Sequence, residues 1–156
     1  MTTLMLVRHG ETVDNANRIM QGQTQGQLNE TGIRQAEEVA ISLAGEHVDA
    51  VVSSDLKRSY DTACIIANKH GLDVFTTKLL RERDWGSFTG RYIPDLKEEK
   101  WPDDIESLDH LLYRAKIFLD FVRSEYPDHS VVAVGHGIIN KAIQAVYYKV
   151  TMSEVR

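Results

Sequence analysis

The sequence contains little cysteine or proline and no long apolar run. Cys64 is the single cysteine among its 156 residues, so an internal disulfide is excluded. No stretch approaches the ~18 consecutive apolar residues that a membrane-spanning helix needs. The N-terminus also lacks the charged segment, apolar stretch and cleavage site of a secretory signal. We therefore expect a cytoplasmic protein that does not insert into a membrane.

An excess of basic residues is also missing. The 23 acidic residues outnumber the 18 lysines and arginines, which gives a formal net charge of −5. Nucleic-acid-binding domains usually carry a basic excess on at least one face, so nucleic acid is not the expected partner. With 42% hydrophobic residues, the chain is long enough to bury one core and too short for two ordinary domains. We predict a single domain over residues 1–156.

Short apolar runs alternate along the chain with segments of helical periodicity. Strands are predicted at four places: residues 3–7, 49–53, 74–80 and 131–134. Helices are predicted at residues 31–45, 56–70, 107–126 and 138–148. Because alternating strands and helices form parallel sheets with helices on both faces, we predict an α/β fold, a three-layer α/β/α sandwich around a mostly parallel central sheet.

Two details of packing follow from the same patterns. The runs at 3–7 and 131–134 are almost entirely apolar, which is typical of strands buried on both faces. In the helix at 31–45, the side chains that share one apolar face are those of Ile33, Ala36, Ala40 and Leu43. We expect both strands and this face in the core.

Two histidines directly follow the first and the last predicted strands. His9 lies between Arg8 and Gly10, and His136 lies between two glycines. Ligands of open α/β sheets bind outside the carboxyl ends of the strands, so we expect both imidazoles at one edge of the sheet. Glycine lets the backbone approach a ligand closely. The free N–H groups of the helix after His136 favour an anion at the same point.

Two arginines extend this candidate anion site. Arg8 supplies a fixed charge and a planar donor fork suited to phosphate. Arg58 is one turn into its helix, so its side chain is expected to point back towards the strand ends. Together with the two histidines, these side chains predict a phosphate pocket.

Four motifs occur in one order along the chain. They are Leu6-Val7-Arg8-His9-Gly10-Glu11-Thr12 with Asn15, Ser53-Ser54-Asp55-Leu56-Lys57-Arg58 with Thr62-Ala63, Leu80-Arg81-Glu82 with Gly86 and Gly90, and Gly135-His136-Gly137. This set resembles the signature of the histidine phosphatase superfamily, also called phosphoglycerate mutase-like. The resemblance implies the three-layer fold predicted above and a phosphotransfer activity.

The resemblance also assigns roles to individual residues. It makes His9 the nucleophile that accepts a phosphoryl group from a phosphomonoester, and Glu82 the proton donor, with Asp84 as the main rival. The implied catalytic set is His9, Glu82, His136, Arg8 and Arg58. The implied phosphate contacts are Arg8, Gly10, Asn15, Gln21, Gly22, Arg58, His136 and Gly137. No metal and no other cofactor is implied.

These roles agree with the chemistry of phosphoryl transfer. Charge spreads over three equatorial oxygens in the transition state, so clustered cations supply most of the catalysis. His9 must be neutral to attack, and we expect the surrounding cations to disfavour its protonated form. Glu82 can donate a proton only if burial or a dianionic substrate raises its pKa.

The connection at residues 91–106 is expected to form a small lid. In the family, insertions at this place cover the substrate, and mutases carry a longer, basic one that holds a second anionic group. Here the acidic side chains outnumber the basic ones: Asp95, Glu98, Glu99, Asp103, Asp104 and Glu106 stand against Arg91, Lys97 and Lys100. An acidic lid repels a doubly anionic substrate, so we favour a phosphatase over a mutase.

Three features depart from the pattern of the family. The chain stops at Arg156 soon after the last predicted helix, so we expect the C-terminal edge strand of the family to be absent, either because the protein is naturally short or because this sequence is an incomplete copy. Thr89 stands where a glutamate is common, and Lys141 where an arginine is common. We expect neither difference to abolish phosphotransfer.

The leading hypothesis is a metal-independent phosphomonoesterase that acts on a small phosphorylated metabolite through a phosphohistidine on His9. Three alternatives stay open: a protein phosphohistidine phosphatase, a cofactor-dependent phosphoglycerate mutase, and a catalytically silent phosphate-binding module. The expected partner is a small phosphomonoester, and neither a nucleic acid nor a membrane. The sequence does not indicate the oligomeric state.

Overall fold

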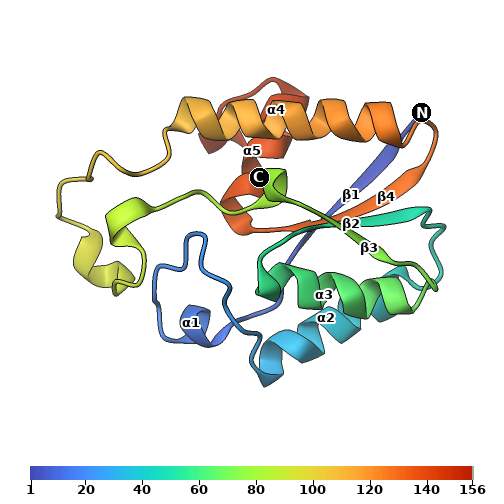
Figure 1. The fold of residues 1–156 in the computed structure, drawn as a ribbon, viewed down its shortest axis with the longest axis horizontal. Coiled ribbons are helices and arrows are strands. Elements are labelled where there is room, and N and C mark those ends of the chain that lie inside the picture. The colour runs from blue at the N-terminus through green and yellow to red at the C-terminus, as the bar shows by residue number, and fades with distance from the viewer. Residues whose placement is uncertain (156) are drawn as a thin grey trace.

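Four parallel strands form the middle layer of the structure. In the computed structural model, which describes residues 1–155, they run in the order β1-β4-β2-β3 (Figure 1). Their bounds are Thr3–Arg8 for β1, Ala50–Ser54 for β2, Val74–Thr77 for β3 and Ser130–Gly135 for β4. Each neighbouring pair in this sheet is parallel, so all carboxyl ends meet at one edge.

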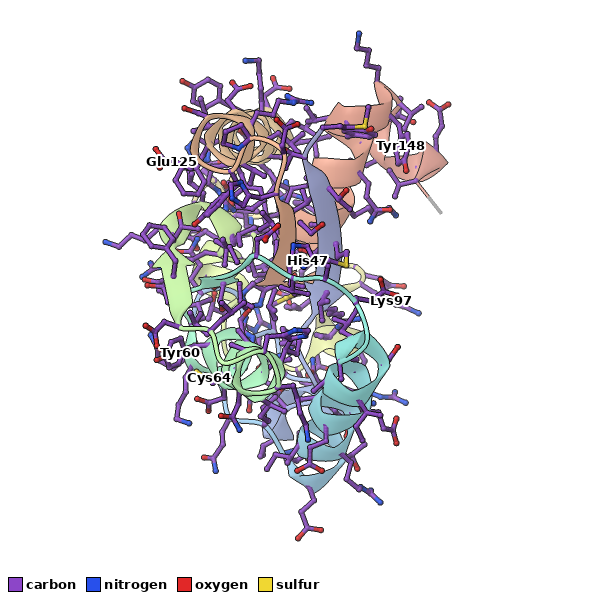
Figure 2. All side chains as sticks on the ribbon, turned by 90° about the vertical axis from the view of Figure 1, so that its right-hand side faces the viewer. His47, Tyr60, Cys64, Lys97, Glu125 and Tyr148 are labelled. Atoms are coloured by element: carbon purple, nitrogen blue, oxygen red, sulfur yellow. The ribbon has the colours of Figure 1, made fainter. Side chains whose placement is uncertain are left out.

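Helices cover both faces of the sheet. They are α1 Val13–Ala16, α2 Glu30–Leu43, α3 Lys57–Asn68, α4 Leu108–Glu125 and α5 Gly137–Tyr148. Helices α4 and α5 lie on one face and α2 and α3 on the other (Figure 1), and the view along the strands shows the sheet between the two pairs (Figure 2). The predicted α/β sandwich is confirmed, and its central sheet is parallel in all four described strands.

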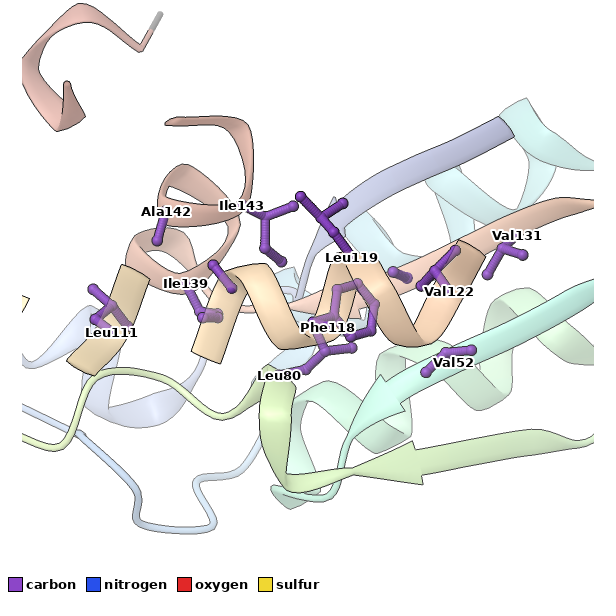
Figure 3. Packing of buried hydrophobic residues seen from close by; sticks show 12 residues of the cluster. Val52, Leu80, Leu111, Phe118, Leu119, Val122, Val131, Ile139, Ala142 and Ile143 are labelled. Carbon is purple, nitrogen blue, oxygen red and sulfur yellow. The ribbon is translucent and has the colours of Figure 1, made fainter. Parts of the chain in front are cut away.

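The larger apolar core lies between the sheet and the pair α4–α5. Phe118, Leu119 and Val122 of α4 point from their helix towards the sheet (Figure 3), and Val131 of β4 is completely buried beneath them. Helix α4 begins after Ser107, whose hydroxyl accepts a hydrogen bond from the His110 amide, as N-cap residues do. A second apolar cluster lies between the sheet and α2–α3.

The structure corrects two of the packing predictions. Strand β1 pairs only with β4 in the described sheet, and its central residues are half-buried rather than buried on both faces. Helix α2 starts one residue earlier than expected, at Glu30, because Asn29 caps it through the Gly32 amide. Its buried face is formed by Gly32, Ala36 and Ala40, whereas Ile33 is 41% exposed.

The segment between β3 and α4 contains short 3-10 turns at Lys78–Leu80, Gly86–Phe88 and Ile93–Leu96. The strand predicted to reach residue 80 therefore ends at Thr77. Trp85, Phe88 and Leu96 are buried together in a small apolar cluster. Backbone hydrogen bonds join this segment to the loop after α1, with Met20 N–H donating to the Arg91 carbonyl at 2.9 Å. The lid is thus packed against a second loop.

The chain after α5 is short. Within the described residues it forms a 3-10 turn at Met152–Glu154 and no further strand. None of the helices described in residues 1–155 combines the length and the apolar composition that a membrane crossing requires. The cytoplasmic location stays a prediction.

Candidate active site

The two histidines meet at the carboxyl edge of the sheet. His9 follows β1 and His136 follows β4, and these strands are direct neighbours. Their ring centroids are 5.0 Å apart, with an interplanar angle of 62°. His9 is 8% exposed and His136 is fully buried. The two imidazoles therefore share one site.

The hydrogen bonding of His9 fixes its tautomer. Nδ1 lies 2.7 Å from the Gly10 carbonyl oxygen, which can only accept, so the proton is on Nδ1 and the lone pair is on Nε2. Burial, together with smaller contributions from the positive charges of Arg58 and Arg8, lowers the pKa of His9 to about 4, although the hydrogen bond to Gly10 opposes the shift. The imidazole is therefore neutral near pH 7. Burial contributes more to this neutral state than the cations, from which the sequence predicted it.

Only one of the two ring nitrogens of His136 has a hydrogen-bond partner among the described residues. Its Nε2 lies 2.9 Å from the Ser54 hydroxyl at the end of β2, and that hydroxyl accepts a further bond from the Leu56 amide. Nδ1 is buried without a hydrogen-bond partner among the described residues. Burial, followed by the nearby Arg58 charge, keeps the pKa of His136 well below its ordinary value. The residue presents a neutral ring with one free nitrogen.

Arg58 uses most of its donors within the protein. It is 1% exposed, and its Nη2 donates to the Gly22 carbonyl at 2.8 Å while Nη1 donates to the carbonyls of Thr24 and Gln25. Nε has no partner in the described structure. Burial lowers the pKa of Arg58 to about 10, so its charge persists at neutral pH. Most of the guanidinium therefore holds the loop at Gly22–Gln25, and its Nε is the nitrogen without a partner in the described structure.

Arg8 extends from the end of β1 across the first turn of α5. A Cβ atom built on Gly137 would lie 3.5 Å from Cζ of Arg8. The side chain is exposed. Arg8 and His9 both line a cavity of about 170 Å³ together with residues of α2 and α3. Arg8 is therefore more exposed than Arg58.

The carboxylate of Glu82 occupies the N-terminus of α5, beside His136. Its Oε2 accepts from the Ile138 amide at 3.1 Å, and Oε1 accepts from the amides of Ile139 and Arg83, both at 3.0 Å. The rival carboxylate of Asp84 is exposed and accepts from the Gly86 amide within its own turn. Of the two acidic residues, Glu82 is the one that binds the N-terminus of the helix that follows His136.

Several predicted phosphate contacts hold loops together in this structure. Asn15 Oδ1 accepts from the Thr12 amide at 3.0 Å, and the Thr12 hydroxyl donates to Oε1 of the buried Gln21 at 2.8 Å. The Gly10 amide donates to the Thr62 hydroxyl at 3.2 Å, while the Gly22 carbonyl accepts a hydrogen bond from Nη2 of Arg58. Contacts of these residues with phosphate stay predictions.

Sequence reasoning missed two polar residues that support the site. Ser54 was noted only as part of a motif, yet it orients His136. Asn140 is 7% exposed and donates from Nδ2 to the Val7 carbonyl at 3.1 Å, which ties α5 to the end of β1. A polar residue one turn after His136 on an otherwise apolar helix was a usable signal for Asn140. Nothing in the local pattern around Ser54 indicated its partner.

The donor set of the site favours an anion. Within residues 1–155 no group of three or more His, Cys, Asp or Glu side chains is arranged to hold a metal ion. The site instead combines the unpartnered Nδ1 of His136, two guanidinium groups and the N-terminus of a 12-residue helix, where two amides donate to the Glu82 carboxylate. Such donors stabilise negative charge on phosphoryl oxygens.

Comparison with known proteins finds relatives over nearly the whole chain. A family model described as the histidine phosphatase superfamily, branch 1, matches residues 4–156. Phosphoserine phosphatase 1 of Hydrogenobacter thermophilus is 33% identical over 169 residues, which cover 99% of this chain and 80% of the relative.

The names of two further similar proteins describe different activities, a mutase and a phosphatase. A probable phosphoglycerate mutase of Yersinia pestis is 45% identical over 103 residues, 65% of this chain and 48% of the relative, so the match spans about half of that protein. Among solved structures, the mycobacterial glucosyl-3-phosphoglycerate phosphatase superposes with a TM-score of 0.84 and 30% identity, over 96% of this chain and 81% of the other.

Proposed function

Because this chain belongs to branch 1 of the histidine phosphatase superfamily and is a phosphatase of that family, we propose that it hydrolyses small phosphorylated metabolites through a phosphohistidine on His9. The observation that carries the proposal is the state of His9. Its Nε2 lone pair is free, its ring is neutral, and His136 lies 5.0 Å away between ring centroids. Such a nucleophile needs no metal to attack a phosphoryl group held by cations.

Two displacements complete the proposed reaction. In the first, Nε2 of His9 forms a bond to phosphorus while the ester P–O bond breaks, and the leaving oxygen takes a proton from Glu82. In the second, water attacks the phosphohistidine, Glu82 takes back a proton from that water, and the P–N bond breaks to release inorganic phosphate. Arg8, the free Nε–H of Arg58 and the free nitrogen of His136 stabilise the equatorial oxygens.

The position of Glu82 suits the first step. The carboxyl group lies at the N-terminus of α5 next to His136, where the leaving oxygen is expected. A phosphoryl group that binds beside it competes for the same N–H donors, and like charges disfavour two anions in one place.

The charges of the lid favour small substrates with a single phosphoryl group. Two of its acidic residues are paired, since Glu99 accepts from Arg91 at 2.9 Å and Glu106 turns inward to Arg114. The side chains that stay exposed still carry more negative than positive charge: Asp95, Glu98, Asp103 and Asp104 against Lys97 and Lys100. A second phosphate would meet net repulsion here.

A substrate panel with chelator present tests the proposal. Phosphoserine, 3-phosphoglycerate, glucosyl-3-phosphoglycerate and sugar phosphates are incubated with the protein, and inorganic phosphate is measured. We expect release from at least one ester, no effect of chelator, and an acid-labile phosphoenzyme that His9→Ala removes. His47→Ala is the matched control, because His47 precedes β2 at the opposite end of the sheet (Figure 2). A requirement for added divalent metal would refute the mechanism.

The same panel separates the phosphatase from a mutase. The similarity to a probable phosphoglycerate mutase over 65% of this chain favours that second activity. The two differ in the fate of the phosphohistidine, which water attacks in one case and a phosphoglycerate hydroxyl in the other. Isomerisation of 3-phosphoglycerate that outpaces phosphate release from every ester would replace the proposed activity with a mutase.

A further inference from the structure

Arg114 of α4 contacts the backbone of the segment that carries Glu82. Its Nη1 donates to the carbonyl of Leu79 at 2.8 Å and to that of Arg81 at 2.9 Å, and its Nη2 reaches the carbonyl of Glu82 itself at 3.4 Å. One guanidinium group thus spans four residues of an irregular segment that has no strand partner of its own.

The position of Arg114 is fixed by a buried ion pair with Glu106. Nε donates to Oε2 and Nη2 to Oε1, both at 2.8 Å, and the side chains are 12% and 5% exposed. Burial by itself would raise the pKa of Glu106, but the hydrogen bonds and charge of Arg114 outweigh it and bring the pKa to about 2. The pair is charged at any physiological pH, and removal of either partner leaves a buried charge without compensation.

Glu106 also connects the end of the lid to the residues after Glu82. Its amide donates to the Asp84 carbonyl at 2.8 Å, and its Oε1 accepts from the Asp84 amide at 3.1 Å. Its carbonyl accepts from Nε of Arg83 at 2.8 Å. Residues 79–84 are therefore held by Arg114 and Glu106, while the Glu82 carboxylate accepts hydrogen bonds from α5.

We propose that Arg114, paired with Glu106, is a positioning residue for proton donation by Glu82. This inference rests on the proposed function. Arg114 does not touch the reacting groups; it fixes the backbone from which the Glu82 carboxyl reaches the leaving oxygen. A misplacement of about 1 Å in such a group costs on the order of 100-fold in rate.

The test compares two aryl esters that differ in their need for a proton. Phenyl phosphate has a basic leaving group, whereas 2,4-dinitrophenyl phosphate releases a phenolate that needs no proton. We expect Arg114→Gln to lower kcat/KM, which reports phosphoenzyme formation, by about 100-fold on phenyl phosphate, and to leave kcat/KM on the dinitrophenyl ester within about threefold. Glu82→Gln should give the same selective loss, and both variants should lose the alkaline limb of the kcat/KM profile on phenyl phosphate.

The controls distinguish a positioning role from a structural one. Arg123→Gln removes an exposed arginine of the same helix and should behave as wild type on both esters. Arg114→Lys keeps the charge beside Glu106 without the bonds to the carbonyls. Its activity on phenyl phosphate should therefore lie between those of wild type and Arg114→Gln. This variant replaces Arg114→Gln in the test if Arg114→Gln does not fold. Equal losses on both esters would overturn the inference. If the wild-type protein forms no phosphoenzyme with either aryl ester or with any ester of the metabolite panel, the proposed function itself fails.

Discussion

Strands β1 and β4 look alike in the sequence and occupy different places in the fold. Both are apolar runs that end beside a histidine and a glycine. Strand β4 lies between β1 and β2 and is buried over Val131–Gly135, whereas β1 has β4 as its one partner in the described sheet and is half-buried. An apolar run therefore predicts a strand more securely than it predicts how many neighbours the strand has.

The difference in burial carries over to the two histidines. His136 is fully buried and bound to Ser54, so it is a fixed group in the floor of the site. His9 follows the outer strand, retains a little exposure and lies next to the exposed Arg8. The central strand supplies a rigid donor, and the outer strand supplies the group that a substrate can approach.

The largest expected effect separates the two histidines by function. His9→Ala should abolish the phosphoenzyme and lower kcat by at least about 10⁴-fold, because it removes the nucleophile. His136→Ala should slow phosphoenzyme formation by about 10²- to 10³-fold, the usual cost of one stabilising donor, without eliminating it. Rapid quenching with a radiolabelled ester measures both rates. A phosphoenzyme of normal yield in His9→Ala would show that the roles are assigned wrongly.

A smaller effect concerns stability at acid pH. Both histidines have lowered pKa values in the folded state, while in the unfolded chain they titrate near 6.5. Between that value and about pH 4 the unfolded state binds more protons, so the free energy of unfolding should fall as the pH falls, by at most about 1.4 kcal/mol per pH unit for each histidine. Above about pH 7 this dependence disappears.

Urea denaturation at pH 7 and pH 5 measures the dependence. His9→Gln and His136→Gln should each reduce the loss of stability between the two pH values, and the exposed His129→Gln should not. If both site variants lose as much free energy of unfolding between pH 7 and pH 5 as the wild type does, the imidazoles are not kept neutral in the folded protein.

The sequence predicted elements well where local signals agreed. Helix α4 was expected at 107–126 and spans Leu108–Glu125, because apolar residues recur at helical spacing along it and Pro127 prevents a continuation. The order of strands had no such signal. Burial of β1 on both faces was expected from its apolar run, but such a run does not show how many strands and helices will pack against it.

The same limit applies to the site. The positions of His9, Glu82 and His136 along the chain indicated which residues meet, since each lies at or after a strand end or in a recognised motif. The partners of Arg58 were not predictable, because they are carbonyls of a loop whose path has no periodic pattern. The contacts of Arg114 likewise join segments about 30 residues apart.

The smallest expected effect tests the comparison of the strands directly. Val7 and Val134 are register partners on β1 and β4 and pack in the same apolar cluster, but Val134 is fully buried and Val7 is half-buried. Val134→Ala should lower the free energy of unfolding by about 2 kcal/mol and Val7→Ala by about 1 kcal/mol, because the loss scales with the apolar area removed from water and with the cavity that remains. Denaturant titration with a common m-value measures both. Equal losses would mean that the open side of β1 is covered in solution, and the contrast between an outer and a central strand would then no longer explain the different exposure of the two histidines.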